Sequence, residues 1–224
     1  MRNLKAYSDP KEYSMMNNKE IIKQVSDYYS QKVLSHGATP EGVDWNGEES
    51  QNVRFSQLLK ITDKRDGISI NDIGCGYGAL NEILFERNKP YTYYGYDISP
   101  EMISQASQLY SDHKHIAFIE SSEPTMKADY SIASGIFNVM LDNDEDIWKK
   151  YVKEVLKQIN EFSLEGFAFN MLTSYSDEDK KEDKLYYASP EEVFSFCKHS
   201  FSKDVALLHD YGLYEFTILV RKNV

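Results

Sequence analysis

The sequence has few of the features that mark metal-binding, secreted or membrane proteins. Only two of its 224 residues are cysteines, Cys75 and Cys197, and neither belongs to a CxxC pair or a Cys/His cluster. We therefore expect two free thiols and no bound metal. No apolar run approaches the roughly 20 residues of a membrane span, and the N-terminus lacks the apolar core of a signal peptide. These absences predict a cytoplasmic protein.

Basic residues are also scarce. The chain has 25 Lys and Arg against 36 Asp and Glu, which gives a formal charge of −11, and no basic cluster appears. Because affinity for nucleic acids comes mostly from basic patches, this balance disfavours a nucleic acid as partner. We expect a small molecule as the partner and neither a nucleic acid nor a membrane. The sequence leaves the oligomeric state open.

One acidic segment alternates like the start of a calcium-binding loop. Its residues are Asp142, Asp144 and Asp146, but no glycine and bidentate glutamate follow at the offsets that such a loop requires. Negative charge is also favoured at the start of a helix. From Trp148 to Phe162, apolar residues recur at three and four residue steps, so the acids are interpreted as a helix start.

Short apolar runs and helical patterns alternate from Ile68 onward, which is typical of a parallel sheet with crossover helices. The strands expected first lie at 68–73, 91–96, 116–119, 130–133 and 167–172. Two more, 205–208 and 215–220, are joined by a connection too short for a parallel crossover, so they must be antiparallel. The predicted fold is α/β, with a seven-stranded, mostly parallel sheet and an antiparallel terminal strand.

The first part of the chain differs from the rest. Two helical patterns, around 21–33 and 50–61, flank a stretch rich in Gly, Pro and Asp. We expect residues 1–67 to form an N-terminal helical cap, and residues 68–224 to form the α/β domain. The run from Ser174 to Lys184 is strongly polar and is interpreted as a surface loop.

A glycine-rich turn, Asp72–Gly78 (DIGCGYG), follows the first predicted strand and opens a helix. Open α/β sheets bind ligands at this place, outside the carboxyl ends of their strands. Glycines let the backbone turn tightly and approach a ligand closely. Asp97, at the end of the second predicted strand, is well placed to accept hydrogen bonds from ribose hydroxyls.

The same turn also satisfies the G-x-G-x-x-G/A pattern of dinucleotide-binding enzymes, through Gly74, Gly76 and Ala79. Asp72, however, places a carboxylate close to the turn. It would repel a pyrophosphate and attract a cationic ligand. A third glycine, Gly78, and the antiparallel pair at the end of the chain also point away from a dinucleotide.

At these residues the chain resembles the class I S-adenosylmethionine (SAM) dependent methyltransferases. Asp72–Gly78 is similar to the first glycine-rich motif of that family, and Tyr94–Ile103 (YGYDISPEMI) to its second strand and following helix. Ala128–Val139 (ADYSIASGIFNV) looks like the fourth strand. In topology the resemblance covers roughly residues 68–221. It implies a Rossmann-like class I methyltransferase fold with SAM as cofactor and S-adenosylhomocysteine (SAH) as product.

The resemblance also implies roles for individual residues. Gly74, Gly76 and Gly78, with Cys75 between them, would pass close to the methionyl part of SAM, and Asp72 would lie near its amino group. Asp97 would hold the ribose, and Ile98 and Met102 would lie against the adenine. The polar residue at the adenine amino group would come from Glu120, Ser121 or Ser122, and we choose Ser121. The Asn/Asp-Pro-Pro-Tyr motif of enzymes that methylate adenine or glutamine is absent at 134–137.

The methyl acceptor is harder to infer. We expect its pocket to be formed by the cap and by the loops after the fourth, fifth and sixth strands, from His36, Trp45, Phe137, Asn138, Asn170 and Tyr211. His209 stands at the end of a predicted strand and is either a general base for the acceptor or a residue that packs at the sheet edge. Arg54 pairs either with the carboxylate of SAM or with Glu48 or Glu49.

The function predicted from the sequence is transfer of a methyl group to an oxygen or nitrogen of a small molecule. Two alternatives stay open at this point. One is an NAD(P)-dependent oxidoreductase, which would have to tolerate Asp72 beside the dinucleotide. The other is a regulatory subunit that binds SAM without catalysis.

Overall fold

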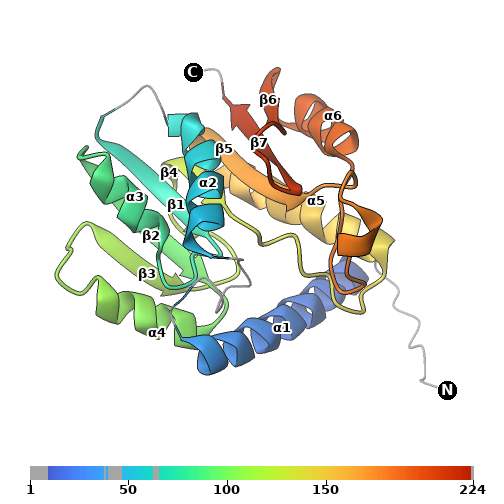
Figure 1. Cartoon of the computed structure of the whole chain (residues 1–224), viewed down its shortest axis with the longest axis horizontal. Coiled ribbons are helices and arrows are strands. Elements are labelled where there is room, and N and C mark those ends of the chain that lie inside the picture. The colour runs from blue at the N-terminus through green and yellow to red at the C-terminus, as the bar shows by residue number, and fades with distance from the viewer. Residues whose placement is uncertain (1–9, 38, 40–46, 63–65, 223–224) are drawn as a thin grey trace.

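The computed structural model describes residues 10–37, 39, 47–62 and 66–222, with side chains from residue 18 onward except that of His36. The elements run, in chain order, α1 (Pro10–His36), α2 (Glu48–Leu58), the 3-10 helix η2 (Leu59–Thr62), β1 (Ile68–Ile73), α3 (Leu80–Glu86), β2 (Tyr91–Asp97), α4 (Pro100–Leu109), β3 (Ile116–Glu120), β4 (Ala128–Ala133), α5 (Glu145–Phe162), β5 (Ser163–Leu172), the 3-10 helix η3 (Glu178–Lys180), α6 (Pro190–Ser200), β6 (Asp204–Leu208) and β7 (Glu215–Arg221) (Figure 1).

The strands form one seven-stranded sheet in the order β3-β2-β1-β4-β5-β7-β6. Strands β1 to β5 pair in parallel, while β7 runs antiparallel to both β5 and β6. The register places Ile70 between Tyr93 and Tyr130. The expected α/β fold, with a mostly parallel sheet and an antiparallel terminal pair, is confirmed.

Helices pack on both faces of this sheet because its central strands are apolar on both sides. On one face, Ile70, Ile132 and Ala168 belong to a core cluster that also contains residues of α2 and α3. On the other, Phe167 and Phe169 belong to a cluster with residues of α5 and α6. Neighbouring residues of β5 thus point to opposite faces, as the pleat of a strand requires.

The element boundaries follow local signals where such signals exist. Ser99 caps α4, with its hydroxyl accepting from the Met102 N–H at 3.3 Å, and a proline follows it at the first helical position. Asp144 caps α5 in the same way, through the N–H groups of Asp146 and Ile147. The helix-start interpretation of these acids is therefore confirmed. Strand β5 begins four residues before the predicted start. Its first four residues were not predicted because they carry no apolar pattern, and Leu164 among them is half-exposed.

Helix α1 lies along one side of the molecule, from α4 toward α5 (Figure 1). Its Ser26 hydroxyl donates to the Ile98 carbonyl oxygen at 2.9 Å, and its Asn18 amide donates to Glu154 of α5 at 2.5 Å. None of the described helices is both long and apolar enough to cross a membrane.

Candidate functional site

The turn between β1 and α3 is built on glycines. Gly74, Gly76 and Gly78 have φ angles of 71°, 53° and 85°, which side chains strongly disfavour. At Gly74 there is also no space, because a Cβ atom would lie 2.2 Å from Cγ2 of Ile136. The Gly74 N–H donates to the Tyr96 carbonyl oxygen at 2.8 Å, which fixes the turn to β2. Because these residues have no side chains, a ligand beside the turn can approach the backbone closely.

Two buried carboxyl groups lie next to this turn. Asp72 accepts a hydrogen bond from the Tyr93 hydroxyl at 2.6 Å. The pKa of Asp72 is raised to about 7, mainly by burial and in smaller part by the charge of Asp97, against the lowering effect of that hydrogen bond. Burial also raises the pKa of Asp97, although the N–H groups of Ser99 and Gly76, each 2.9 Å from its carboxylate, lower it. A ligand with a cationic group or hydroxyl donors would stabilise the ionised form of both carboxyl groups.

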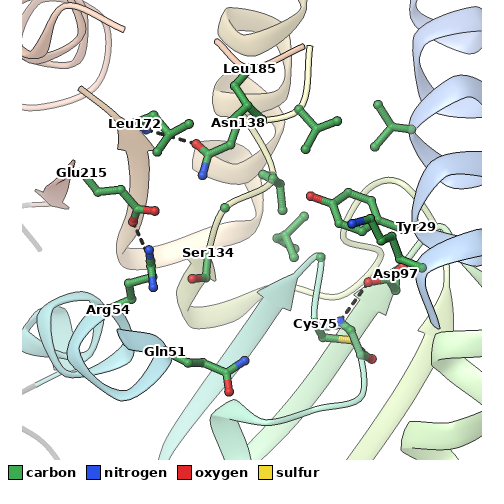
Figure 2. Close-up of a pocket in the computed structure, with 18 of the residues that line it drawn as sticks. Tyr29, Gln51, Arg54, Cys75, Asp97, Ser134, Asn138, Leu172, Leu185 and Glu215 are labelled. Atoms are coloured by element: carbon green, nitrogen blue, oxygen red, sulfur yellow. Dashed lines mark hydrogen bonds and ion pairs between the residues drawn. The ribbon is translucent and has the colours of Figure 1, made fainter. Parts of the chain in front are cut away.

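Both acids line a cavity of about 830 Å³ at the carboxyl ends of the strands (Figure 2). Most of the predicted cofactor residues are brought together in its wall: Arg54, Asp72, Gly74, Cys75, Gly76, Asp97, Ile98, Met102 and Ser121. Gly78 lies just behind the wall. A Cβ atom there would be 2.8 Å from Cζ of Phe118, so this glycine serves close packing of the turn.

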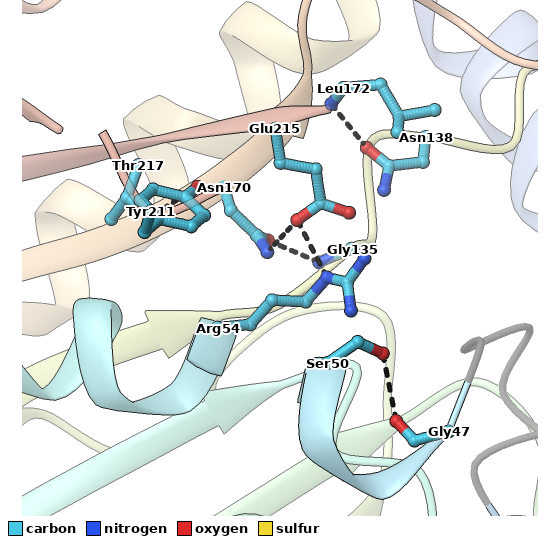
Figure 3. Close-up of polar contacts among 10 residues, drawn as sticks. All are labelled: Gly47, Ser50, Arg54, Gly135, Asn138, Asn170, Leu172, Tyr211, Glu215 and Thr217. Carbon is cyan, nitrogen blue, oxygen red and sulfur yellow. Dashed lines mark hydrogen bonds and ion pairs between the residues drawn. The ribbon is translucent and has the colours of Figure 1, made fainter. Parts of the chain in front are cut away.

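A polar network forms the wall on another side of the cavity (Figure 3). Nε of Arg54 donates to Oε2 of Glu215 at 2.9 Å, and the Asn170 amide donates to the same oxygen at 2.7 Å. The Gly135 N–H donates to Oδ1 of Asn170 at 2.7 Å. The network therefore connects α2, the loop after β4, β5 and β7. Sequence reasoning considered only Glu48, Glu49 and SAM as partners of Arg54 and missed Glu215.

The residues predicted to line the acceptor pocket have different positions. Asn138 lines the cavity, and its Oδ1 accepts from the Leu172 N–H at 3.1 Å. Phe137 is fully buried in the core, and Asn170 is fully buried behind Glu215. Tyr211 shares a 3.0 Å hydrogen bond with Oγ1 of Thr217, and burial raises its pKa. Of these four side chains, the structure places only that of Asn138 in the cavity wall.

His209 is exposed and packs beside Tyr175 and Phe216, with ring centroids 6.0 and 6.2 Å away. It is not among the described residues that line the cavity. Its predicted role as a general base therefore gains no support from its position. Trp45 and the side chain of His36 lie outside the described residues.

The sequence analysis expected the cap to contribute to the pocket, but it did not predict four of the side chains that line the cavity. Tyr29 and Lys32 of α1 line it, as do Lys184 and Tyr187 from the segment between β5 and α6. That segment was interpreted as a surface loop because it is polar. In the structure the Lys184 carbonyl oxygen accepts from the N–H groups that follow Val139, at 2.9 and 2.8 Å, which holds the segment against the loop after β4.

One signal could have located Glu215. An antiparallel strand begins at the edge where its parallel neighbours end, so the first residue of the predicted last strand belongs beside the ligand site. No comparable signal pointed to Gln51, whereas Ser134 is the first residue of the loop after the predicted fourth strand, which was expected to form the pocket; both line the cavity. In the described part of the chain, no group of three or more His, Cys, Asp or Glu side chains is arranged to hold a metal ion.

Comparisons with known proteins agree with this geometry. Residues 71–162 match the family model described as a methyltransferase domain. A Mycobacterium tuberculosis protein named "Putative methyltransferase" is 49% identical over 164 residues, which are 73% of this chain and 99% of that protein.

Solved structures of low sequence identity share the fold. The magnesium protoporphyrin IX methyltransferase of Synechocystis PCC 6803 with bound SAH has a TM-score of 0.62 at 13% identity, over 90% of this chain and 99% of that one. The N-methyltransferase NodS of Bradyrhizobium japonicum WM9 in complex with SAH has a TM-score of 0.63 at 13% identity, over 88% and 97%.

Proposed function

The chain belongs to the class I SAM-dependent methyltransferases, and from this membership we propose that it transfers the methyl group of SAM to an oxygen or nitrogen of a small-molecule acceptor. The observation that carries the proposal is one cavity that reaches from the glycine turn to the network around Glu215. Its volume of about 830 Å³ lies within the range of small-molecule pockets. The formal charge of −11 supports a small acceptor over a nucleic acid.

The residues around the glycine turn fit SAM. Asp72 would hold the ammonium group. It is buried in the cavity wall, where its ionised carboxylate is unfavourable unless a cation pairs with it. Asp97 would accept hydrogen bonds from the ribose hydroxyls, through the carboxylate lone pairs that do not already accept from the N–H groups of Gly76 and Ser99. Ile98 and Met102 would contact the adenine, and Ser121 would bond its amino group. Arg54, already paired with Glu215, lies where it could also contact the carboxylate of SAM.

SAM supplies a methyl group on a sulfonium, which is already a good leaving group. The chain's own residues then have to hold the acceptor in line and exclude water. We propose that residues 1–67 act as a cap in this respect, because Tyr29 and Lys32 close the cavity from α1. Lys184 and Tyr187 would close it from the segment between β5 and α6. Such a site needs no shared catalytic triad, and His209 has no required role in it.

Two experiments test the proposal. In calorimetric titrations, SAM and SAH should bind, whereas NADH should not, because Asp72 disfavours a pyrophosphate. Tight NADH binding would favour the oxidoreductase instead. In a second experiment, SAH release is measured with panels of small alcohols, phenols and amines. If SAM binds but no acceptor raises SAH release above the background, a regulatory SAM-binding role would replace the enzymatic proposal.

A further inference from the structure

Resting on the function proposed above, we propose that Glu215 recognises the methyl acceptor. Its carboxylate oxygen Oε1 would accept a hydrogen bond from a hydroxyl or amine of that acceptor. Glu215 begins β7, lines the cavity and is only 1% exposed. The proposal assigns a chemical class to the acceptor, a molecule that presents a hydrogen-bond donor to this wall.

The two oxygens of the Glu215 carboxylate have different surroundings. Oε2 accepts both hydrogen bonds of the network, from Arg54 at 2.9 Å and from Asn170 at 2.7 Å. Oε1 is buried and has no hydrogen-bond partner among the described residues. Leaving a buried carboxylate oxygen without a donor costs free energy, and most such groups in native proteins are satisfied. A bound molecule with a donor group would supply the missing partner.

Arg54 and Asn170 act as positioning residues. By binding Oε2, they fix the rotation of the carboxylate and leave Oε1 directed away from the network (Figure 3). The Arg54 guanidinium also balances the charge of Glu215, so the pair is neutral as a whole. A neutral pair with an open acceptor atom favours a hydroxyl or amine and disfavours a carboxylate or phosphate at Oε1.

A second polar atom supports this assignment. Oγ of Ser134, directly after β4, is buried and also has no hydrogen-bond partner within the described residues. Ser134 lines the same cavity, and Figure 2 shows it between the Arg54–Glu215 pair and the turn that carries Cys75. Two buried polar atoms without a partner, one at the start of β7 and one directly after β4, therefore belong to residues that line one cavity, on the other side from Asp97. This is the arrangement expected for a few polar groups that orient a ligand.

The test uses the full-length protein saturated with SAH and three probes of matched shape: benzyl alcohol, benzylamine and benzoate. We expect benzyl alcohol or benzylamine to bind about tenfold more tightly than benzoate in calorimetric titrations. Comparison of benzyl alcohol with benzylamine shows whether a hydroxyl or an amine is the preferred donor. In Glu215→Gln, the amide oxygen would take the bonds from Arg54 and Asn170 and the NH₂ group would face the cavity. The preference should then disappear or reverse while SAH remains bound.

The control variant is Asp66→Asn, which also removes one carboxylate charge, but from an exposed pair with Lys89. It should bind all three probes as the wild type does. Equal binding of the probes to the wild type, or failure of both donor probes to bind, would overturn the proposal. So would an unchanged preference in Glu215→Gln combined with a large loss of SAH affinity, which would assign Glu215 to the cofactor.

If Glu215→Gln does not fold, the proposal is tested by a crystal structure of the wild-type protein with SAH and the donor probe that binds more tightly. The probe's oxygen or nitrogen should lie about 3 Å from Oε1 of Glu215, and any other location refutes the proposal. These measurements involve no methyl transfer. Failure of the proposed function would appear as absent SAH release, whereas failure of this inference appears as absent head-group preference.

Discussion

Asp72 is a buried carboxyl group whose pKa lies near physiological pH. Its surroundings favour the protonated form, because water is excluded and Asp97 stands nearby. A cationic ligand reverses that preference by adding an opposite charge at close range. Affinity for SAM and stability of the ligand-free protein should therefore depend on pH in opposite directions.

Affinity for SAM should rise as the pH increases through about 7, since the ionised form of Asp72 binds the ammonium group. Asp72→Asn should bind SAM at least about tenfold more weakly at pH 8 and lose most of this pH dependence. Tyr93→Phe removes the hydrogen bond that lowers the pKa, so the midpoint should move to higher pH. Calorimetric titrations from pH 6 to 9 measure this. A midpoint that is the same in all three proteins would contradict the assignment.

The same group should destabilise the ligand-free fold at neutral pH. Its pKa is raised from an ordinary 3.8 to about 7, so the folded protein holds a proton that the unfolded chain has lost. Between these values the free energy of unfolding should fall as the pH rises, by at most about 4 kcal/mol, and Asp72→Asn should not show this part of the decline. Urea unfolding at pH 5 and pH 8 measures the free energy of unfolding of the wild type and of Asp72→Asn. A parallel pH dependence of wild type and variant would be incompatible with this explanation.

Gly74 combines a left-handed backbone with a close approach to a side chain. Gly74→Ala should lower the free energy of unfolding by about 2 to 4 kcal/mol and weaken SAM binding, because the new Cβ meets Ile136 in addition to the strained φ. Gly67→Ala is the matched control. It has the same φ of 71° but open space, so it should lose only about 1 kcal/mol. Equal losses would show that backbone strain alone makes Gly74 necessary.

Among the helices, α1 depends on a few polar contacts to stay beside the cofactor site. Ser26 bonds to the Ile98 carbonyl oxygen, and Ser30 bonds to Glu101 at 2.8 Å. The double variant Ser26→Ala/Ser30→Ala should lose about 2 kcal/mol of stability, exchange the amide hydrogens of α1 faster and bind SAM a few-fold more weakly.

A third serine provides the control for this experiment. The Ser35 hydroxyl bonds only to the Gln31 carbonyl oxygen of its own helix, among the contacts described. Ser35→Ala should therefore leave hydrogen exchange and SAM affinity near the wild-type values. If the double variant behaves like Ser35→Ala, then apolar packing through Ile21 and Val25, with the hydrogen bond from Asn18 to Glu154, is sufficient to hold α1 in place.

Across the whole molecule, the fold could be predicted because its signals are local. The alternation of apolar runs and helical patterns placed β1 at its observed boundaries, and the short connection before Glu215 fixed the antiparallel pair. The turn from Asp72 to Gly78 was found in the same way, because its glycines are adjacent in sequence. Sequence reasoning thus predicted most of the residues on the glycine-turn side of the cavity wall.

The other side was not predicted in this way, because it depends on contacts between distant parts of the chain. Arg54 and Glu215 are separated by 161 positions, and periodicity carries no information about which residues meet across such a distance. Asn170 was predicted to line the acceptor pocket, but its buried side chain is not among the described residues of the cavity wall and instead donates to Glu215. Polar composition likewise gave no indication that Lys184 would line a cavity.

The position of β7 has a consequence for how the protein is made. β6 is joined to the sheet only through β7, which follows both β5 and β6 in the chain and inserts between them. A chain still attached to the ribosome can build the glycine turn early, while β5 keeps an open edge until β7 has been synthesised. Glu215 is the first residue of β7, so the cavity acquires this wall only after the glycine turn has formed, and a chain that stops before β7 would lack it.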